Sequence, residues 1–322
     1  MRVWAKAAVS AGLLVLLFVL LPWADVMAAV SRMPARVWLL VLVVFAFGHL
    51  IGVQKWRLLL HASRGRLAYL EGLRCYGAGL FANLCLPSIV GGDVLRAVMA
   101  GRATGRVEAA FLSGIMDRVI DIATLALLIS GGAVFARQVL PGWGGEVLTA
   151  VLAVGLAVTA LALPFVLRRP LAAWPRRLRR PIGRALVALR HLSEHPGDAA
   201  MAMAMSLAIQ SGFVLLNAWI GATIGIHLAL SVWFMAWPLA KVAGLMPISL
   251  GGLAVRDATF GALLLPLGVP MAQGVVAALV WQTVMIAGGL LGGLAWWLLS
   301  RKSAAPGSGS WGELLTPARP NG

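Results

Sequence analysis

The chain has 322 residues, of which 61% are hydrophobic, and its formal net charge at pH 7 is +16. Its mean hydropathy is +0.90, and apolar runs of about 18 residues or more, long enough to cross a bilayer core, recur along it. This composition excludes a water-soluble protein, which needs more polar surface, and a membrane β-barrel, which shows short alternating segments. The sequence therefore predicts an all-α polytopic membrane protein.

The positive charge comes mostly from arginines that lie between the apolar runs. Basic loops of membrane proteins stay on the cytoplasmic side, so this pattern favours membrane topology over nucleic-acid binding as the reason for the charge. We expect no nucleic-acid partner. The two cysteines, Cys75 and Cys85, lie in one apolar stretch without metal-ligand spacing and are predicted to be small buried residues.

The chain begins with a short basic segment, residues 1–6, and an apolar stretch, residues 7–27. Because that stretch is long, we predict a retained first span rather than a cleaved signal peptide. A second span is predicted at residues 37–53. The segment after it holds four bases and is predicted to be a cytoplasmic loop: Lys55, Arg57, Arg64 and Arg66.

Residues 69–100 form the first interrupted element. The segment is apolar, but it contains Pro87 and the pair Gly91-Gly92. Proline removes a backbone donor, and paired glycines allow two backbone segments to approach closely. Neither arm is long enough for a full span, so we predict a re-entrant hairpin or a pair of short helices.

The next full span is predicted at residues 108–136 and carries Asp117, Arg118 and Asp121. At the helical rise, Asp117 would lie about 15 Å deep, near mid-bilayer. An external loop and another span, at residues 147–167, follow.

Residues 168–190 are the most basic segment of the chain and are predicted to be cytoplasmic. Four apolar residues recur there at a spacing of four, which predicts an amphipathic helix along the membrane surface: Trp174, Leu178, Ile182 and Leu186.

A further span is predicted at residues 199–224, with Gln210 and Asn217, and an external loop follows it. Residues 231–266 form the second interrupted element. Its breaks are Pro247, Gly251 and Gly252, with Lys241 before them and Arg256 and Asp257 after them. The last span, residues 271–299, ends at two bases, so both termini are expected in the cytoplasm. Residues 303–322 are predicted to be a disordered tail.

The two interrupted elements share one pattern, a proline, Gly-Gly four residues later and an arginine four residues after the second glycine, 160 positions apart. Three full spans separate them, and an odd number of crossings between similar units makes inverted repeats. We predict one transmembrane domain, residues 1–302, with six full spans and two re-entrant elements. Its 4+4 repeats cover about residues 7–136 and 147–300.

Charged side chains at membrane depth are costly and are usually paired or face a cavity. Arg96 and Arg256 stand out because a guanidinium suits phosphate. The structural alternative is internal ion pairing, for example of Asp93 with Arg118. Asn83 could bond either the freed backbone or a headgroup. The substrate-site candidates are Asn83, Asp93, Arg96, Asp117, Arg118, Asp121, Lys241, Arg256 and Asp257.

Enzyme signatures are missing from the sequence. No HExxH, GxSxG or GxxxxGK[ST] occurs. The five histidines are interpreted as forming no ligand spacing, and a metal between Asp117 and Asp121 is disfavoured. We expect no enzymatic activity, metal or cofactor. The histidines are His49, His61, His191, His195 and His227.

Three segments together carry a family resemblance: residues 83–96, residues 117–121 and residues 247–257. The chain resembles the flippase-like integral membrane family related to the transmembrane region of lysylphosphatidylglycerol synthases, which includes hopanoid-associated members. The similarity covers roughly residues 5–300. It implies lipid translocation across the cytoplasmic membrane. The family often has Glu at the positions of Asp117 and Asp257, where this chain keeps the charge on a shorter side chain.

We expect a flippase for an anionic or isoprenoid-type lipid, whose phosphate or other anionic headgroup binds Arg96 and Arg256. One alternative is a secondary transporter of a small soluble anion. Another is a scaffold that binds a lipid-synthesis enzyme through the basic segment at residues 168–190. No soluble aminoacyl-transferase domain follows in this sequence, so the chain is not expected to make an aminoacyl lipid itself.

Overall fold

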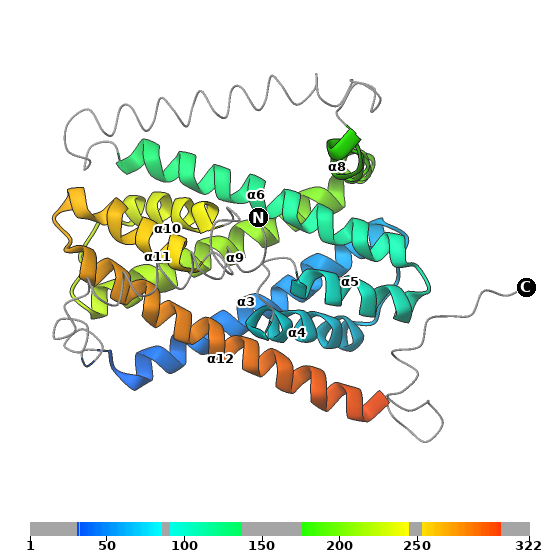
Figure 1. Ribbon diagram of the computed structural model, residues 1–322, viewed down its shortest axis with the longest axis horizontal. Coiled ribbons are helices and arrows are strands. Elements are labelled where there is room, and N and C mark those ends of the chain that lie inside the picture. The colour runs from blue at the N-terminus through cyan, green and yellow to red at the C-terminus, as the bar shows by residue number, and fades with distance from the viewer. Residues whose placement is uncertain (1–30, 32, 86–90, 137–175, 245–252, 304–322) are drawn as a thin grey trace, which may run out of the picture.

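The computed structural model describes residues 31, 33–85, 91–136, 176–244 and 253–303 (Figure 1). All regular structure within these ranges is helical, in nine α-helices and one short 3-10 helix. This confirms the all-α prediction for the described part of the chain. Several predicted features lie outside it: the spans at residues 7–27 and 147–167, the breaks Pro87, Pro247, Gly251 and Gly252, and the tail after Ser303.

Four of the described helices are long and apolar enough to cross a membrane. They are α3 (Ala35–Ala62), α6 (Val107–Ala136), α9 (Pro196–Thr223) and α12 (Met271–Ser303). One face of α3 buries Val41 and Phe45, while Leu39, Val43 and Phe47 on other faces are exposed. Large apolar side chains on the outside of a helical bundle are expected where the surroundings are lipid rather than water.

Four shorter helices fill the space between the long ones. They are α4 (Tyr69–Cys85), α5 (Gly91–Thr104), α10 (Leu230–Gly244) and α11 (Leu253–Leu264), the last followed by η3 (Leu265–Leu267). α4 packs on α5 and α12, and α10 packs on α11 and α6. The α4–α5 pair occupies one half of the bundle and the α10–α11 pair the other (Figure 1). Short helices therefore lie on either side of each interruption, which for residues 69–100 agrees with one of the two predicted alternatives.

Glycines bring long and short helices into close backbone contact. A Cβ on Gly77 of α4 would lie 2.5 Å from the carbonyl oxygen of Gly292 of α12. A Cβ on Gly132 of α6 would lie 2.5 Å from the amide nitrogen of Met235 of α10. Small residues allow such close approach, which supplies van der Waals packing where lipid gives no hydrophobic drive. Gly132 and Gly292 are themselves 160 positions apart.

The largest buried cluster joins α3, α6, α9, α10, α11 and α12. Its aromatic rings meet edge to face or tilted: Trp237 lies 5.1 Å from Phe260 and 5.7 Å from Trp281, and Phe45 lies 5.3 Å from Trp281. Aromatic pairs at these separations contribute about 0.5–1.5 kcal/mol each beyond area burial. The half of the bundle around α10 and α11 is therefore held mainly by apolar packing.

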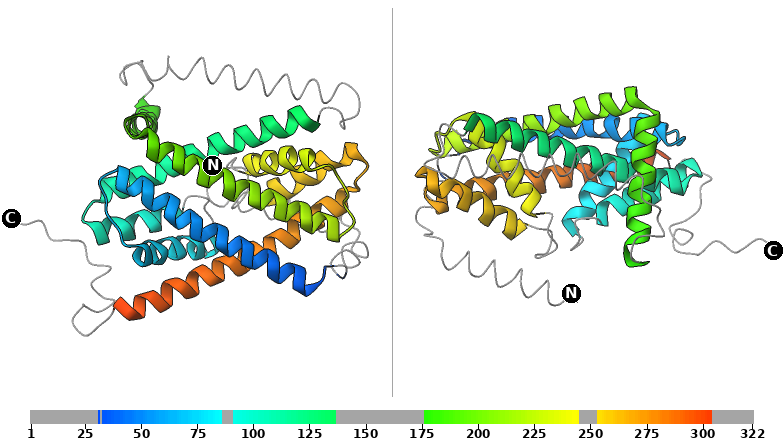
Figure 2. Two further views of the ribbon diagram at one scale, coloured as in Figure 1. Left: turned by 180° about the vertical axis from the view of Figure 1, so that it is seen from behind. Right: turned by 90° about the horizontal axis from the view of Figure 1, so that it is seen from above.

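Helix α8 (Arg176–Glu194) lies crosswise to the long helices at one end of the bundle (Figure 2). It packs against α6 and α9, where Leu186 and Ala188 are buried. The sequence predicts an amphipathic helix here, and the structure forms one.

The second span is longer than the predicted residues 37–53. Its helix continues to Ala62, so Lys55 and Arg57 lie in α3 and not in a loop. The reason is burial: Trp56, Leu59 and Leu60 after the lysine have no exposed surface. A loop there would leave backbone groups without partners.

Candidate functional site

A network of buried charges connects α3, α5 and α6. The ammonium of Lys55 lies 2.9 Å from an oxygen of Asp117 and 2.5 Å from an oxygen of Asp121. The second oxygen of Asp117 accepts a hydrogen bond from Arg96 at 3.1 Å. Lys55, Arg96 and Asp117 are all buried. Asp117 therefore contacts two cations at once, and together with Asp121 it lowers the cost of holding them away from water.

Asp93 extends this network toward the surface. It lies in the first turn of α5, where a negative charge interacts well with the helix dipole. Its oxygens pair with Arg96 at 3.5 Å and accept a bond from the Nε of Arg118 at 2.8 Å. The side chain of Arg118 is 45% exposed. The pair between Asp93 and Arg118, named in the sequence analysis as the structural alternative, is present.

Aromatic rings enclose the guanidinium of Arg96. Its central carbon lies 4.8 Å from the centre of a ring of Trp56 and 5.1 Å from that of Tyr76. Trp56 is fixed in turn by donating its indole N–H to Ser113 at 3.1 Å. A desolvated cation between aromatic faces gains about 2 kcal/mol or more. The arrangement holds the guanidinium fork in a fixed plane.

The start of α5 is fixed against α4. The side-chain oxygen of Asn83 accepts a hydrogen bond from the backbone N–H of Gly92 at 3.0 Å. A Cβ on Gly92 would overlap Asn83 and the carbonyl oxygen of Gly79, so only glycine fits. Of the two roles predicted for Asn83, the structure contains the bond to backbone. Gly91 begins the same helix.

Polar groups of α9 and α10 lie next to the network. Ser206 donates a hydrogen bond to Asp121 at 2.7 Å. Lys241 donates to the side-chain oxygen of Gln210 at 2.8 Å. Among the described residues no carboxylate lies within 4.0 Å of the Lys241 ammonium. This lysine is therefore satisfied by a neutral amide and lacks a described counter-charge.

Arg256 forms a second, smaller site between α10, α11 and α12. It bonds its neighbour Asp257 at 2.8 Å and Gln282 of α12 at 3.0 Å. Its guanidinium lies 5.6 Å from a ring of Trp237 of α10. Both Arg256 and Asp257 are buried.

The two arginine sites are built alike. Each arginine starts from the helix that follows an interruption, α5 or α11. Each bonds an acceptor on the next long helix, Asp117 or Gln282. Each also faces an aromatic ring of the preceding short helix, Tyr76 or Trp237. The difference is that the Arg96 site also contains Lys55 and a second ring from α3, so it holds more charge.

Five members of the main network are among the candidates predicted from the sequence: Asp93, Arg96, Asp117, Arg118 and Asp121. Lys241 adjoins it through α9 and α10, while Arg256 and Asp257 belong to the second site. Four further residues of the site were not predicted as site residues: Lys55, Trp56, Tyr76 and Ser206. For Lys55, the apolar residues that follow it in the sequence could have indicated that the helix continues past the lysine. Two acids one helical turn apart on α6 were a second signal, because they require a base from elsewhere.

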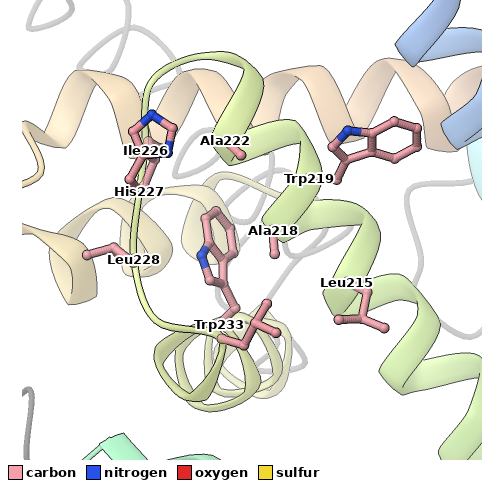
Figure 3. A pocket seen from close by; sticks show the side chains of 9 residues that line it. Leu215, Ala218, Trp219, Ala222, Ile226, His227, Leu228 and Trp233 are labelled. Carbon is pink, nitrogen blue, oxygen red and sulfur yellow. The ribbon is translucent and has the colours of Figure 1, made fainter.

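An open apolar pocket with a volume of about 540 Å³ lies where α9 ends and α10 begins (Figure 3). Trp219 and Trp233 line it, and His227 is the one ionisable residue among its nine lining residues. This lining suits a hydrocarbon chain better than a charged headgroup.

A family model described as the lysylphosphatidylglycerol synthase transmembrane region matches residues 3–293. No curated protein and no solved structure matches the chain at a significant level. The family match and the four long apolar helices make this a multi-pass membrane protein of a family tied to lipid handling.

Proposed function

The chain belongs to the family of lysylphosphatidylglycerol synthase transmembrane regions, and from this premise we propose that it moves a lipid with an anionic headgroup across the cytoplasmic membrane. Phosphate, or another anionic group, is the chemistry that the two arginine sites would recognise. Isoprenoid-type lipid phosphates belong to the same chemical class.

The observation that carries the proposal is the enclosed guanidinium of Arg96. A guanidinium fork that is buried, stacked and bonded to a carboxylate is pre-organised for a second oxyanion of similar shape. The network has three bases, Lys55, Arg96 and Arg118, and three acids, Asp93, Asp117 and Asp121, so it is neutral when closed. A headgroup would exchange for one of these carboxylates.

Two cations supply the attraction that such an exchange needs. Arg118 is the half-exposed edge of the network, so an approaching headgroup would meet it first. Lys241 has no described carboxylate partner and adds one positive charge beside the neutral network. Our proposal is that the anion enters at Arg118 and is held by Arg96 and Lys241.

We further propose that two inverted repeats provide access from each side. Helix pairing supports this: α4 on α12 has its counterpart in α10 on α6, and α5 on α6 in α11 on α12. The α4–α5 pair begins and ends at one end of the bundle, and the α10–α11 pair at the opposite end (Figure 1). Paired broken elements of this kind occur in transporters that alternate access around a central site.

The orientation follows from the bases at the helix ends. Arg64, Arg66, Arg106 and Arg190 lie close in sequence to the last residues of α3, α5 and α8. These helix ends lie at the same end of the bundle as the end of α12, the helix that carries Arg301 (Figure 1). By the positive-inside rule we place this end in the cytoplasm, with both chain termini and the inner membrane as location. We also propose that the chain is not itself an enzyme.

The scaffold alternative has one observation in its favour. Helix α8 is strongly basic and lies across the end of the bundle, where a lipid-synthesis enzyme could bind (Figure 2). A soluble-anion transporter would use the same arginines, so only the transported substrate separates it from a flippase.

The experiment is a flip assay in proteoliposomes with a panel of headgroup-labelled lipids. Wild type would be compared with the Arg96→Ala, Arg256→Ala double variant and with Arg102→Ala, which removes an exposed arginine of the same helix α5. We expect one anionic lipid class to cross with wild type and with Arg102→Ala, but not with the double variant. Uptake of a soluble anion without lipid movement would establish the alternative, and loss of partner binding only after charge removal from α8 would establish the scaffold.

A further inference from the structure

We propose that His191, Glu194 and His195 form a binding site for a divalent transition metal, of which Zn²⁺ is the best fit, at the corner between α8 and α9. One ligand atom from each of the three residues lies within 4.8 Å of the other two. His191 and Glu194 are in the last turn of α8, and His195 caps the start of α9. From the sequence alone these histidines are interpreted as having no ligand spacing, but the fold brings their ligand atoms close together.

The hydrogen bond that His195 makes is compatible with metal binding. Its Nδ1 lies 3.2 Å from the carbonyl oxygen of His191, so Nδ1 carries the proton and donates it. That leaves the lone pair of Nε2 free. Metal-binding histidines commonly donate their other ring N–H to a carbonyl, because this fixes the tautomer and the ring direction.

The second observation is an unsatisfied atom. The Nδ1 of His191 is buried and has no hydrogen-bond partner among the described residues. It lies 4.0 Å from an oxygen of Glu194, too far for a hydrogen bond. Two ligands of one tetrahedral zinc are about 3.3–3.5 Å apart, given bonds of about 2.0–2.1 Å. A small side-chain rotation would therefore bring the Nδ1 of His191 and the oxygen of Glu194 to the separation at which both can bind one Zn²⁺ ion.

Two nitrogens and one carboxylate oxygen are a donor set that suits zinc, with a fourth position left for water. The site is reachable, since the side chain of Glu194 is 64% exposed. The ion would join the end of α8 to the start of α9. Helix α8 packs on α6 and α9, the helices that carry Asp117 and Ser206. The metal site does not depend on the proposed transport function.

The test is equilibrium dialysis of the full-length, tag-free protein against Zn²⁺, followed by elemental analysis, with thermal unfolding as a second readout. Removal of the tag matters because a histidine tag binds zinc. We expect one Zn²⁺ per chain and a rise in unfolding temperature with zinc, because an ion that binds only the folded state stabilises it.

The His191→Ala, His195→Ala double variant should lose both effects. A matched variant, His61→Ala with His227→Ala, removes two histidines elsewhere and should keep them. Glu194→Gln changes an exposed side chain and leaves the fold intact, so it separates loss of binding from misfolding; we expect its zinc affinity to fall about tenfold or more. The proposal is overturned if wild type retains no more zinc than the His191→Ala, His195→Ala double variant. It is also overturned if Glu194→Gln keeps its zinc affinity while the matched variant loses zinc binding.

Discussion

The ammonium of Lys55 lies 2.9 Å from a carboxylate oxygen of Asp117, and both side chains are buried. The pair joins α3 to α6, and a second carboxylate from the same face of α6, Asp121, contacts the same ammonium. In a membrane interior such a charge survives only with its partners, because each unpaired ion carries a large desolvation penalty. The network around Asp117 therefore holds α3 to α6. A bound headgroup would have to replace one of its carboxylates as the partner of a base.

Lys55→Met should destabilise the protein by about 3–5 kcal/mol, the usual cost of breaking a buried pair from one side. The variant leaves three acids facing two bases. Adding Asp121→Asn restores equal numbers, so the double variant should regain most of the loss. Thermal unfolding of the purified variants in detergent measures both effects. Equal unfolding temperatures for the single and double variants would mean that charge balance does not hold α3 to α6.

Arg96→Lys tests whether the planar guanidinium of Arg96, and not only its positive charge, is needed. Lysine keeps the positive charge, but it loses the planar donors and the stacking between Trp56 and Tyr76. We expect lipid flux to fall about tenfold or more, since loss of 1.4 kcal/mol of headgroup interaction is a factor of ten. We also expect a lower unfolding temperature, because the contacts of the guanidinium with the rings stabilise the fold as well. Arg102→Lys, at an exposed position of α5, is the control and should leave flux unchanged. Wild-type flux in Arg96→Lys would show that only the charge matters.

Much of the fold was predictable because long apolar runs report membrane spans directly. The spans predicted at residues 108–136, 199–224 and 271–299 correspond closely to α6, α9 and α12. Lys55 was not predicted, because a base after an apolar run is normally the first residue of a cytoplasmic loop. Its long-range partners on α6, Asp117 and Asp121, allow this charge to lie inside the protein.

The candidate site was predictable in its charges but not in its surroundings. The interruptions and the acids of α6 stand out in sequence because charge is rare in apolar segments. The rings around Arg96 come from α3 and α4. The sequence of an apolar helix does not indicate which neighbouring helix its aromatic residues face. The His191 and His195 arrangement was overlooked because it spans the end of one helix and the start of the next.

Gly132→Ala should destabilise the protein by about 1–3 kcal/mol, a typical cost of overpacking. Its new methyl group would press on the backbone of α10 at Met235. Gly131→Ala is the matched control, since a Cβ there meets nothing within 4 Å. Thermal unfolding compares the two. If both variants unfold at the same temperature, the contact between α6 and α10 is looser than described.

Lys241→Met should separate stability from transport. The lysine lacks a described carboxylate, so its removal relieves the cost of a desolvated cation, although Gln210 loses its donor, which costs about 1 kcal/mol. The two effects oppose each other, and we expect an unfolding temperature equal to or above that of wild type. Lipid flux should nevertheless fall about tenfold or more, because the excess positive charge beside the network is gone. Val242→Met, at the exposed neighbouring position, controls for the added side chain and should keep full flux. A stable Lys241→Met with unchanged flux would remove this lysine from the headgroup site.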